Sequence, residues 1–146
     1  MPSRRGGRLG SVGVLVLALA VLGAGNAEET GVDLVLTADK ATYARSEPIV
    51  LTIAVVNRGP DPVTLQFLTA QRYDVVIRTA DQVDVWRWSD GQMFAQVLGS
   101  QTVRGRGVLR YRVTVRHRLP AGRHTVVASV PAEGAALEAS LPITVR

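Results

Sequence analysis

The sequence contains no cysteine and only two histidines among its 146 residues. The absence of cysteine excludes disulfide bonds, thiol catalysis and lipid attachment through an N-terminal cysteine. His117 and His124 are too few for a histidine-based metal site, and no Gly-x-Ser-x-Gly nucleophile motif accompanies them. Asp81, Asp84 and Asp90 do not have the spacing of an EF-hand loop. The sequence therefore predicts a protein that is not an enzyme and that uses no cofactor or metal.

Long apolar runs are also missing, except for one near the N-terminus. Three arginines precede an apolar stretch at residues 9–24, and the small residues Gly25 and Ala27 follow it. This is the three-part pattern of a secretory signal peptide, and the stretch is shorter than the roughly 20 residues of a membrane-spanning helix. We expect residues 1–27 to be a cleaved signal peptide and residues 28–146 to form one domain, secreted or held in the cell envelope or periplasm. The alternative is an uncleaved segment that anchors the chain in a membrane.

The net charge is small once that segment is removed. Three of the 17 basic residues lie in it, which leaves 14 against 12 acidic residues and a net charge of +2. A domain so close to neutrality is not expected to bind nucleic acid specifically.

What the chain does contain is a series of short runs rich in valine, isoleucine, threonine and leucine, separated by glycine, proline, asparagine and aspartate. This pattern indicates strands and turns. Eight strands are predicted, at residues 32–37, 49–57, 63–67, 73–78, 83–88, 108–115, 125–130 and 137–145. The run at 49–57 is apolar on both faces and should lie inside a sheet, and the runs at 73–78 and 83–88 should form a hairpin. We expect Pro131 to end one strand, and Pro142 to require a sheet edge or a bulge. The predicted fold class is all-β, an immunoglobulin-like antiparallel β-sandwich of seven to eight strands.

The most regular alternation in the chain separates an apolar face from a basic face. The apolar face holds Leu109, Tyr111, Val113, Val115 and His117. The opposite face holds Thr114 and a row of arginines, namely Arg110, Arg112, Arg116 and Arg118. No acidic residue occurs between Asp90 and Glu133, so neutralisation must come from elsewhere. Either a neighbouring strand supplies acids to a solvated face, or the row contacts an anionic partner such as an envelope polymer.

Three short motifs resemble the intracellular proteinase inhibitor (BsuPI) family. They are Gln71-x-Tyr73-Asp74, Trp86-x-Trp88-Ser89 and Met93-Phe94-x-Gln96. A Glu47-Pro48 strand opening, Asn57 before its turn, and Gly105 ahead of a later strand add to the resemblance, which covers about 85 residues from Ser46 onward. It implies an immunoglobulin-like sandwich and a protease as partner. An export signal and the Gly105-Arg106-Gly107 sequence depart from the family pattern.

Each motif also has an interpretation from residue chemistry. Trp86, Trp88 and Tyr73 should anchor the core, although an exposed pair of indoles would suit a sugar or a peptide. Asp74 should be buried and cap a loop through backbone N–H groups, and Gln71 should serve the same turn.

Residues 90–98 lose the strand alternation but keep apolar side chains. They form either a crossover that buries Phe94 and Leu98, or a protease-facing loop. In the second case the contact candidates are Gln92, Met93, Phe94 and Gln96, with an apolar anchor for a subtilisin-like serine protease. The function predicted first is proteinase inhibition, through residues 90–98 or through an edge strand laid along the protease cleft. The alternative is an exported structural or adhesive module that binds an anionic partner.

Overall fold

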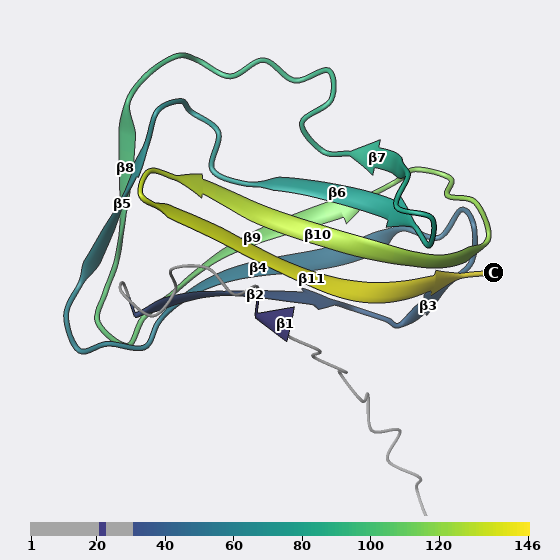
Figure 1. Ribbon diagram of the computed structural model, residues 1–146, viewed down its shortest axis with the longest axis horizontal. Coiled ribbons are helices and arrows are strands. Elements are labelled where there is room, and N and C mark those ends of the chain that lie inside the picture. The colour runs from purple at the N-terminus through teal and green to yellow at the C-terminus, as the bar shows by residue number, and fades with distance from the viewer. Residues whose placement is uncertain (1–20, 23–30) are drawn as a thin grey trace, which may run out of the picture.

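The computed structural model describes residues 21–22 and 31–146, without the side chains of residues 21, 22, 135 and 136. Every regular element in this part of the chain is a strand (Figure 1). The strands are β1 (Val21–Leu22), β2 (Val32–Ala38), β3 (Thr42–Tyr43), β4 (Ile49–Asn57), β5 (Val63–Phe67), β6 (Asp74–Thr79), β7 (Asp84–Arg87), β8 (Gly99–Val103), β9 (Val108–Val115), β10 (Gly122–Ala132) and β11 (Ala135–Val145). The predicted signal segment lies outside the described residues, apart from β1.

The strands form two facing sheets and a short third one. The larger sheet has the order β1-β11-β10-β6-β7, with β3 also paired to β11, and the second sheet has the order β2-β4-β9. Strands β5 and β8 pair with each other and run across one end of the molecule (Figure 1). Every pairing is antiparallel except that of β3 with β11. The fold is an immunoglobulin-like β-sandwich, as the sequence predicts.

The core lies between the sheets because side chains alternate along each strand. In β4 every second residue from Ile49 to Asn57 is buried, and the residues between them are half-buried. The largest fully buried side chains come from both sheets and from β5: Tyr43, Phe67, Leu36, Leu51, Ile53, Ile77 and Ile143. The prediction that β4 is an inner strand is confirmed, since it pairs with both β2 and β9.

All eight predicted strands are present, but the predicted number was too low. The described residues contain eleven strands, and the chief omission is β8, whose Gly99, Ser100 and Gln101 give little strand signal. The predicted hairpin is confirmed as β6 and β7. His117 was wrongly assigned to the core face, because β9 ends at Val115 and the alternation ends with it.

Both prolines in strands occupy edge positions. β10 continues through Pro131, contrary to the prediction that this residue ends the strand. Pro131 lies beyond the last pairing of β10 with β6, at Ser129, so β10 is an edge there and loses no ladder hydrogen bond on that side. On one side of β11, β1 pairs with residues 139–140 and β3 pairs with residues 144–145, and Pro142 lies between these two stretches. Pro142 therefore pairs only with β10, which is the edge position that was predicted.

Candidate functional site

Two of the sequence motifs meet at the end of the β6–β7 hairpin, where Asp74 bonds Ser89, and the third joins them through the contact of Phe94 with Trp88. Asp74 is buried, and its oxygens accept hydrogen bonds from the Ser89 backbone N–H at 3.2 Å and the Ser89 hydroxyl at 2.9 Å. Arg87 donates to the same carboxylate from Nε at 2.9 Å, and its Nη2 forms an ion pair with it at 2.9 Å. The backbone N–H of Val75 donates to it at 2.9 Å. Asp74 therefore fixes the direction in which the chain leaves β7.

A line of aromatic rings connects this corner to the second sheet. The ring centroids are 5.0 Å apart for Tyr111 and Tyr73, 4.3 Å for Tyr73 and Trp88, and 5.8 Å for Trp88 and Phe94. Trp86, Trp88 and Tyr73 are half-buried and pack against the core, which leaves no exposed indole pair. Burial raises the pKa of Tyr73 and of Tyr111, so both phenols stay neutral at physiological pH.

Residues 91–98 follow this cluster and run along one side of the molecule from β7 to β8 (Figure 1). Met93 is 98% exposed, Leu98 76% and Val97 61%. Gln92 and Gln96 are also exposed, and Phe94 is half-buried against Trp88. The interpretation that this segment buries both Phe94 and Leu98 is wrong for Leu98.

Hydrogen bonds to backbone carbonyls hold residues 91–98 in place, although these residues form no helix or strand. The Gln92 side chain donates to the Trp88 carbonyl at 2.6 Å, and the Gln92 backbone N–H donates to the Ser89 carbonyl at 3.1 Å. On the other side of Met93, the Ala70 N–H donates to the Ala95 carbonyl at 2.9 Å. The segment is thus tethered before and after its most exposed side chain.

The turn beneath the segment has its own polar contacts. The Gln71 side chain donates to the Tyr73 carbonyl at 3.1 Å, so Gln71 closes the 69–73 turn and forms no hydrogen bond with Asp74. Arg72 lies over the ring of Phe67, 4.5 Å from its centroid, and donates to the Thr69 carbonyl at 2.7 Å. A side chain on Gly99 would come within 2.4 Å of the Arg72 guanidinium, so a glycine there lets the segment pass close to this turn.

Two members of the basic row, Arg110 and Arg112, lie on the outer face of the second sheet. Arg110 and Arg112 are exposed on β9, while Arg116 and Arg118 follow the end of the strand and are also exposed. The neighbours of Arg110 and Arg112 on β4 are Ala54 and Thr52, so β4 supplies no acid. The ion pairs among the described residues are Lys40–Glu47, Arg58–Asp33, Arg78–Asp84 and Arg87–Asp74, and none involves this row.

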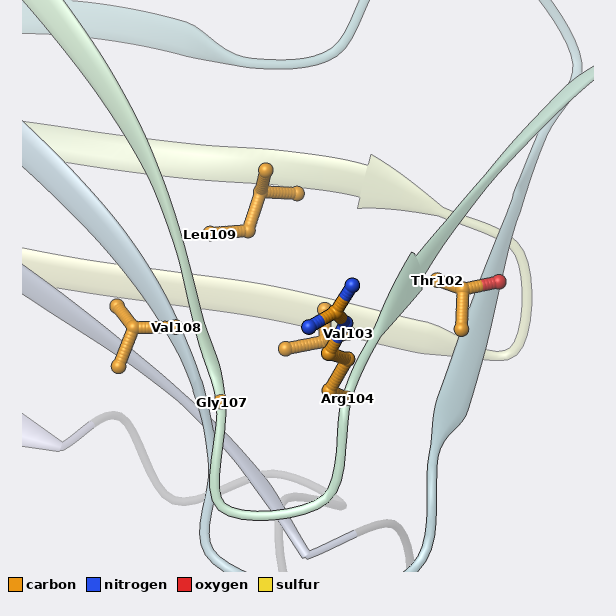
Figure 2. A pocket seen from close by; sticks show the side chains of 6 residues that line it. All are labelled: Thr102, Val103, Arg104, Gly107, Val108 and Leu109. Atoms are coloured by element: carbon orange, nitrogen blue, oxygen red, sulfur yellow. The ribbon is translucent and has the colours of Figure 1, made fainter.

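A pocket of about 320 Å³ opens where β8 and β9 diverge, and nothing in the sequence pointed to it. Its lining comes from both strands and from the turn between them: Thr102, Val103, Arg104, Gly107, Val108 and Leu109. Figure 2 shows the Arg104 side chain extending from the turn into this fork.

Asn57 holds the turn at the base of the fork, and Gly105 lets this turn lie close to the Pro60 carbonyl. The Asn57 amide nitrogen donates to the carbonyls of Asp61 at 2.7 Å, Val103 at 3.2 Å and Arg104 at 3.1 Å. Its Oδ1 accepts from the Gly59 N–H at 3.0 Å. We call this contact between the 57–62 and 103–107 turns the turn latch.

Neither histidine lies in a cluster of catalytic groups. His124 is buried, with Nδ1 3.1 Å from the Gly122 carbonyl, and His117 is exposed. Within residues 21–22 and 31–146, no three histidines or acids are placed to hold a metal ion. No helix in the same residues has the length and apolar character needed to cross a membrane.

The fold and this corner define an immunoglobulin-like β-sandwich with one tethered, exposed apolar segment. Residues 36–135 match the family described as BsuPI, intracellular proteinase inhibitor. The chain belongs to that family, as the motifs predicted, and such an inhibitor family is in general non-catalytic and has proteases as partners.

Similar solved structures agree on the fold. The C-terminal domain of wzt has a TM-score of 0.54 and 11% identity, over 89% of this chain and 78% of that one. The sporulation control protein Spo0M from Bacillus subtilis has a TM-score of 0.53 and 16% identity, over 80% of this chain. The chain spans about half of Spo0M, 49% of its length. At these identities the likeness shows the fold alone, and no curated protein matches the chain.

Proposed function

We propose that the chain inhibits a subtilisin-like serine protease by presenting residues 91–98 to its substrate cleft, with Met93 as the anchor. The observation that carries the proposal is the 98% exposure of Met93 on a segment tethered at Gln92 and at Ala95. Met93 shares the segment with two further exposed apolar side chains, Val97 and Leu98, and such a group marks an interaction surface. A protease with an apolar specificity pocket would bury the anchor.

The tethers matter because ordering a loop on binding costs free energy. A segment already held in one conformation loses less entropy in the complex and binds more tightly. Asp74 holds Ser89 at the start, Trp88 supports Phe94, and Ala70 holds Ala95. Gln92 and Gln96 lie on either side of the anchor and are exposed, so they can meet polar groups at the rim of the cleft.

The test is an inhibition assay of the folded chain against a panel of subtilisin-like proteases. We expect stoichiometric inhibition with the inhibitor remaining intact, and an inhibition constant raised by roughly thirtyfold or more in Met93→Asp, as for an interface hot spot. Because Met93 is exposed, its replacement should leave the denaturant midpoint unchanged.

The matched control is Val83→Asp, which adds the same charge at a side chain 57% exposed in the β6–β7 turn. This variant should inhibit like the parent. Absence of inhibition by the folded chain, or equal losses in the two variants, would contradict the proposal.

We propose in addition that the protein acts outside the cytoplasm, with residues 1–27 removed, so that the mature sheet lacks the two-residue strand β1. The arginines and the apolar stretch at residues 9–24 support this. Expressed with its own N-terminus in a bacterial host, the chain should accumulate in the periplasm or medium and begin at Glu28. Recovery of a full-length chain from the cytosol or the membrane fraction would contradict cleavage and export.

A further inference from the structure

Strand β9 lies at an edge of its sheet. Within the described part of the chain it pairs only with β4, and β8 pairs only with β5, so the fork between β8 and β9 separates two strands that do not pair with each other. The backbone groups on the outer side of β9 are therefore free to pair with another chain.

Hydrogen bonds on both sides of β4 show which residues of β9 face this open edge. The Asn57 N–H donates to the Gly107 carbonyl at 2.9 Å, directly opposite, so the alternate residues Leu109, Tyr111 and Val113 also bond β4. On the other side of β4, the Asp39 N–H donates to the Val50 carbonyl at 3.0 Å. The even-numbered residues of β4 therefore bond on the β2 side, and the odd-numbered residues bond β9. The N–H and C=O groups that point away from β4 therefore belong to Val108, Arg110, Arg112 and Thr114.

The two faces of β9 give this edge a chemical character. Arg110 and Arg112 are exposed on the outer face, and they form no ion pair among the described residues. Leu109 and Tyr111 are half-buried on the inner face. Side chains of neighbouring strands lie beside each other on the same face, so a strand added here meets arginines on one face and apolar groups on the other.

Charge decides between the possible occupants. A second copy that paired through its own β9 would bring arginines close to arginines, which is unfavourable. An acidic strand would pair with them, and Arg104 in the fork adds another positive charge at the same end. We propose that the open edge of β9 binds an extended peptide of alternating acidic and apolar residues, which joins the β2-β4-β9 sheet as a further strand. This binding does not depend on protease inhibition.

A short synthetic peptide that alternates glutamate with valine is the probe, and its binding is followed by fluorescence anisotropy. In Arg110→Glu/Arg112→Glu we expect roughly tenfold weaker binding, since each exposed charge pair contributes up to about 1 kcal/mol. The control, Arg45→Glu/Arg123→Glu, makes the same change in net charge at exposed arginines away from β9, and should bind like the parent. No binding by the parent, or equal losses in the two variants, would overturn the proposal.

Two backbone measurements separate strand addition from simple charge attraction. Two peptides are compared, one N-methylated at the odd-numbered amides and the other at the even-numbered amides. Only one of these sets faces β9, so the affinities of the two peptides should differ by roughly tenfold or more. The amide protons of Arg110 and Arg112 should exchange quickly in the free protein and slowly in the complex. Equal affinity of the two methylated peptides, unchanged exchange, or full displacement by an anionic polysaccharide would instead indicate a general anion-binding surface and overturn strand addition.

Discussion

Replacing Asn57 by alanine should lower the free energy of unfolding by about 3 to 4 kcal/mol. Asn57 is 1% exposed and is the largest single source of polar contacts between the two turns of the turn latch. Alanine would leave the buried bond to the Val103 carbonyl and the partly buried bond to the Arg104 carbonyl without their donor, and each such loss costs about 1 to 3 kcal/mol. Urea unfolding followed by tryptophan fluorescence measures the effect.

The control for Asn57 is an exposed hydrogen bond between neighbouring elements. Thr64 and Thr102 share a hydrogen bond of 2.9 Å between β5 and β8, open to water. Thr64→Ala should cost no more than about 1 kcal/mol, because water replaces the lost partner. Asn57→Asp, which keeps the acceptor for Gly59 but loses the donor, should be as unstable as the alanine variant at neutral pH. A loss below about 1 kcal/mol in Asn57→Ala would show that water or a neighbour can replace the amide.

Replacing Gly105 by alanine should lower the free energy of unfolding by about 3 kcal/mol, at the upper end of overpacking effects. A Cβ at this position would lie 1.9 Å from the Pro60 carbonyl oxygen and 2.5 Å from its carbon. These are backbone atoms of the facing turn, so no side-chain rotation can relieve the clash. The two turns would have to separate, and the Asn57 contacts would lengthen with them.

Gly59 provides the control on the opposite turn. A Cβ there would meet only the Asn57 Oδ1, at 3.5 Å, so Gly59→Ala should change stability by less than about 1 kcal/mol. The double variant Asn57→Ala/Gly105→Ala should lose less than the sum of the single losses, because both changes open the same latch. Additive losses would show that the two residues stabilise the fold independently. The latch bonds the turn that joins β8 to β9, so latch variants that still fold should bind the acidic peptide more weakly.

The resemblance to the BsuPI family pointed to Asn57 and Gly105, but the physical reason for both lies in the structure. In the sequence these residues are separated by a large part of the chain, and each reads as an ordinary turn residue. The close approach of the Pro60 carbonyl explains why a glycine stands at position 105, and the three carbonyls around its amide explain Asn57.

Sequence alone was sufficient for the fold class, the positions of eight of the strands, the inner place of β4 and the separation of basic and apolar residues along β9. Each of these depends on side-chain alternation or on turn chemistry within a few neighbouring residues, where the physical cause is local. It also identified the family through three motifs.

Only the tertiary structure decided how those motifs and strands lie together. Asp74 reaches Ser89, Trp88 stacks on Tyr73, and β9 has an open edge, because of contacts between segments distant in the chain. The residue pattern shows neither β8 nor the fork, and it leaves the exposure of Met93 and Leu98 undecided. The order of the strands and the exposure of each apolar side chain depend on contacts between residues far apart in the chain. A short stretch of sequence carries no information about these contacts.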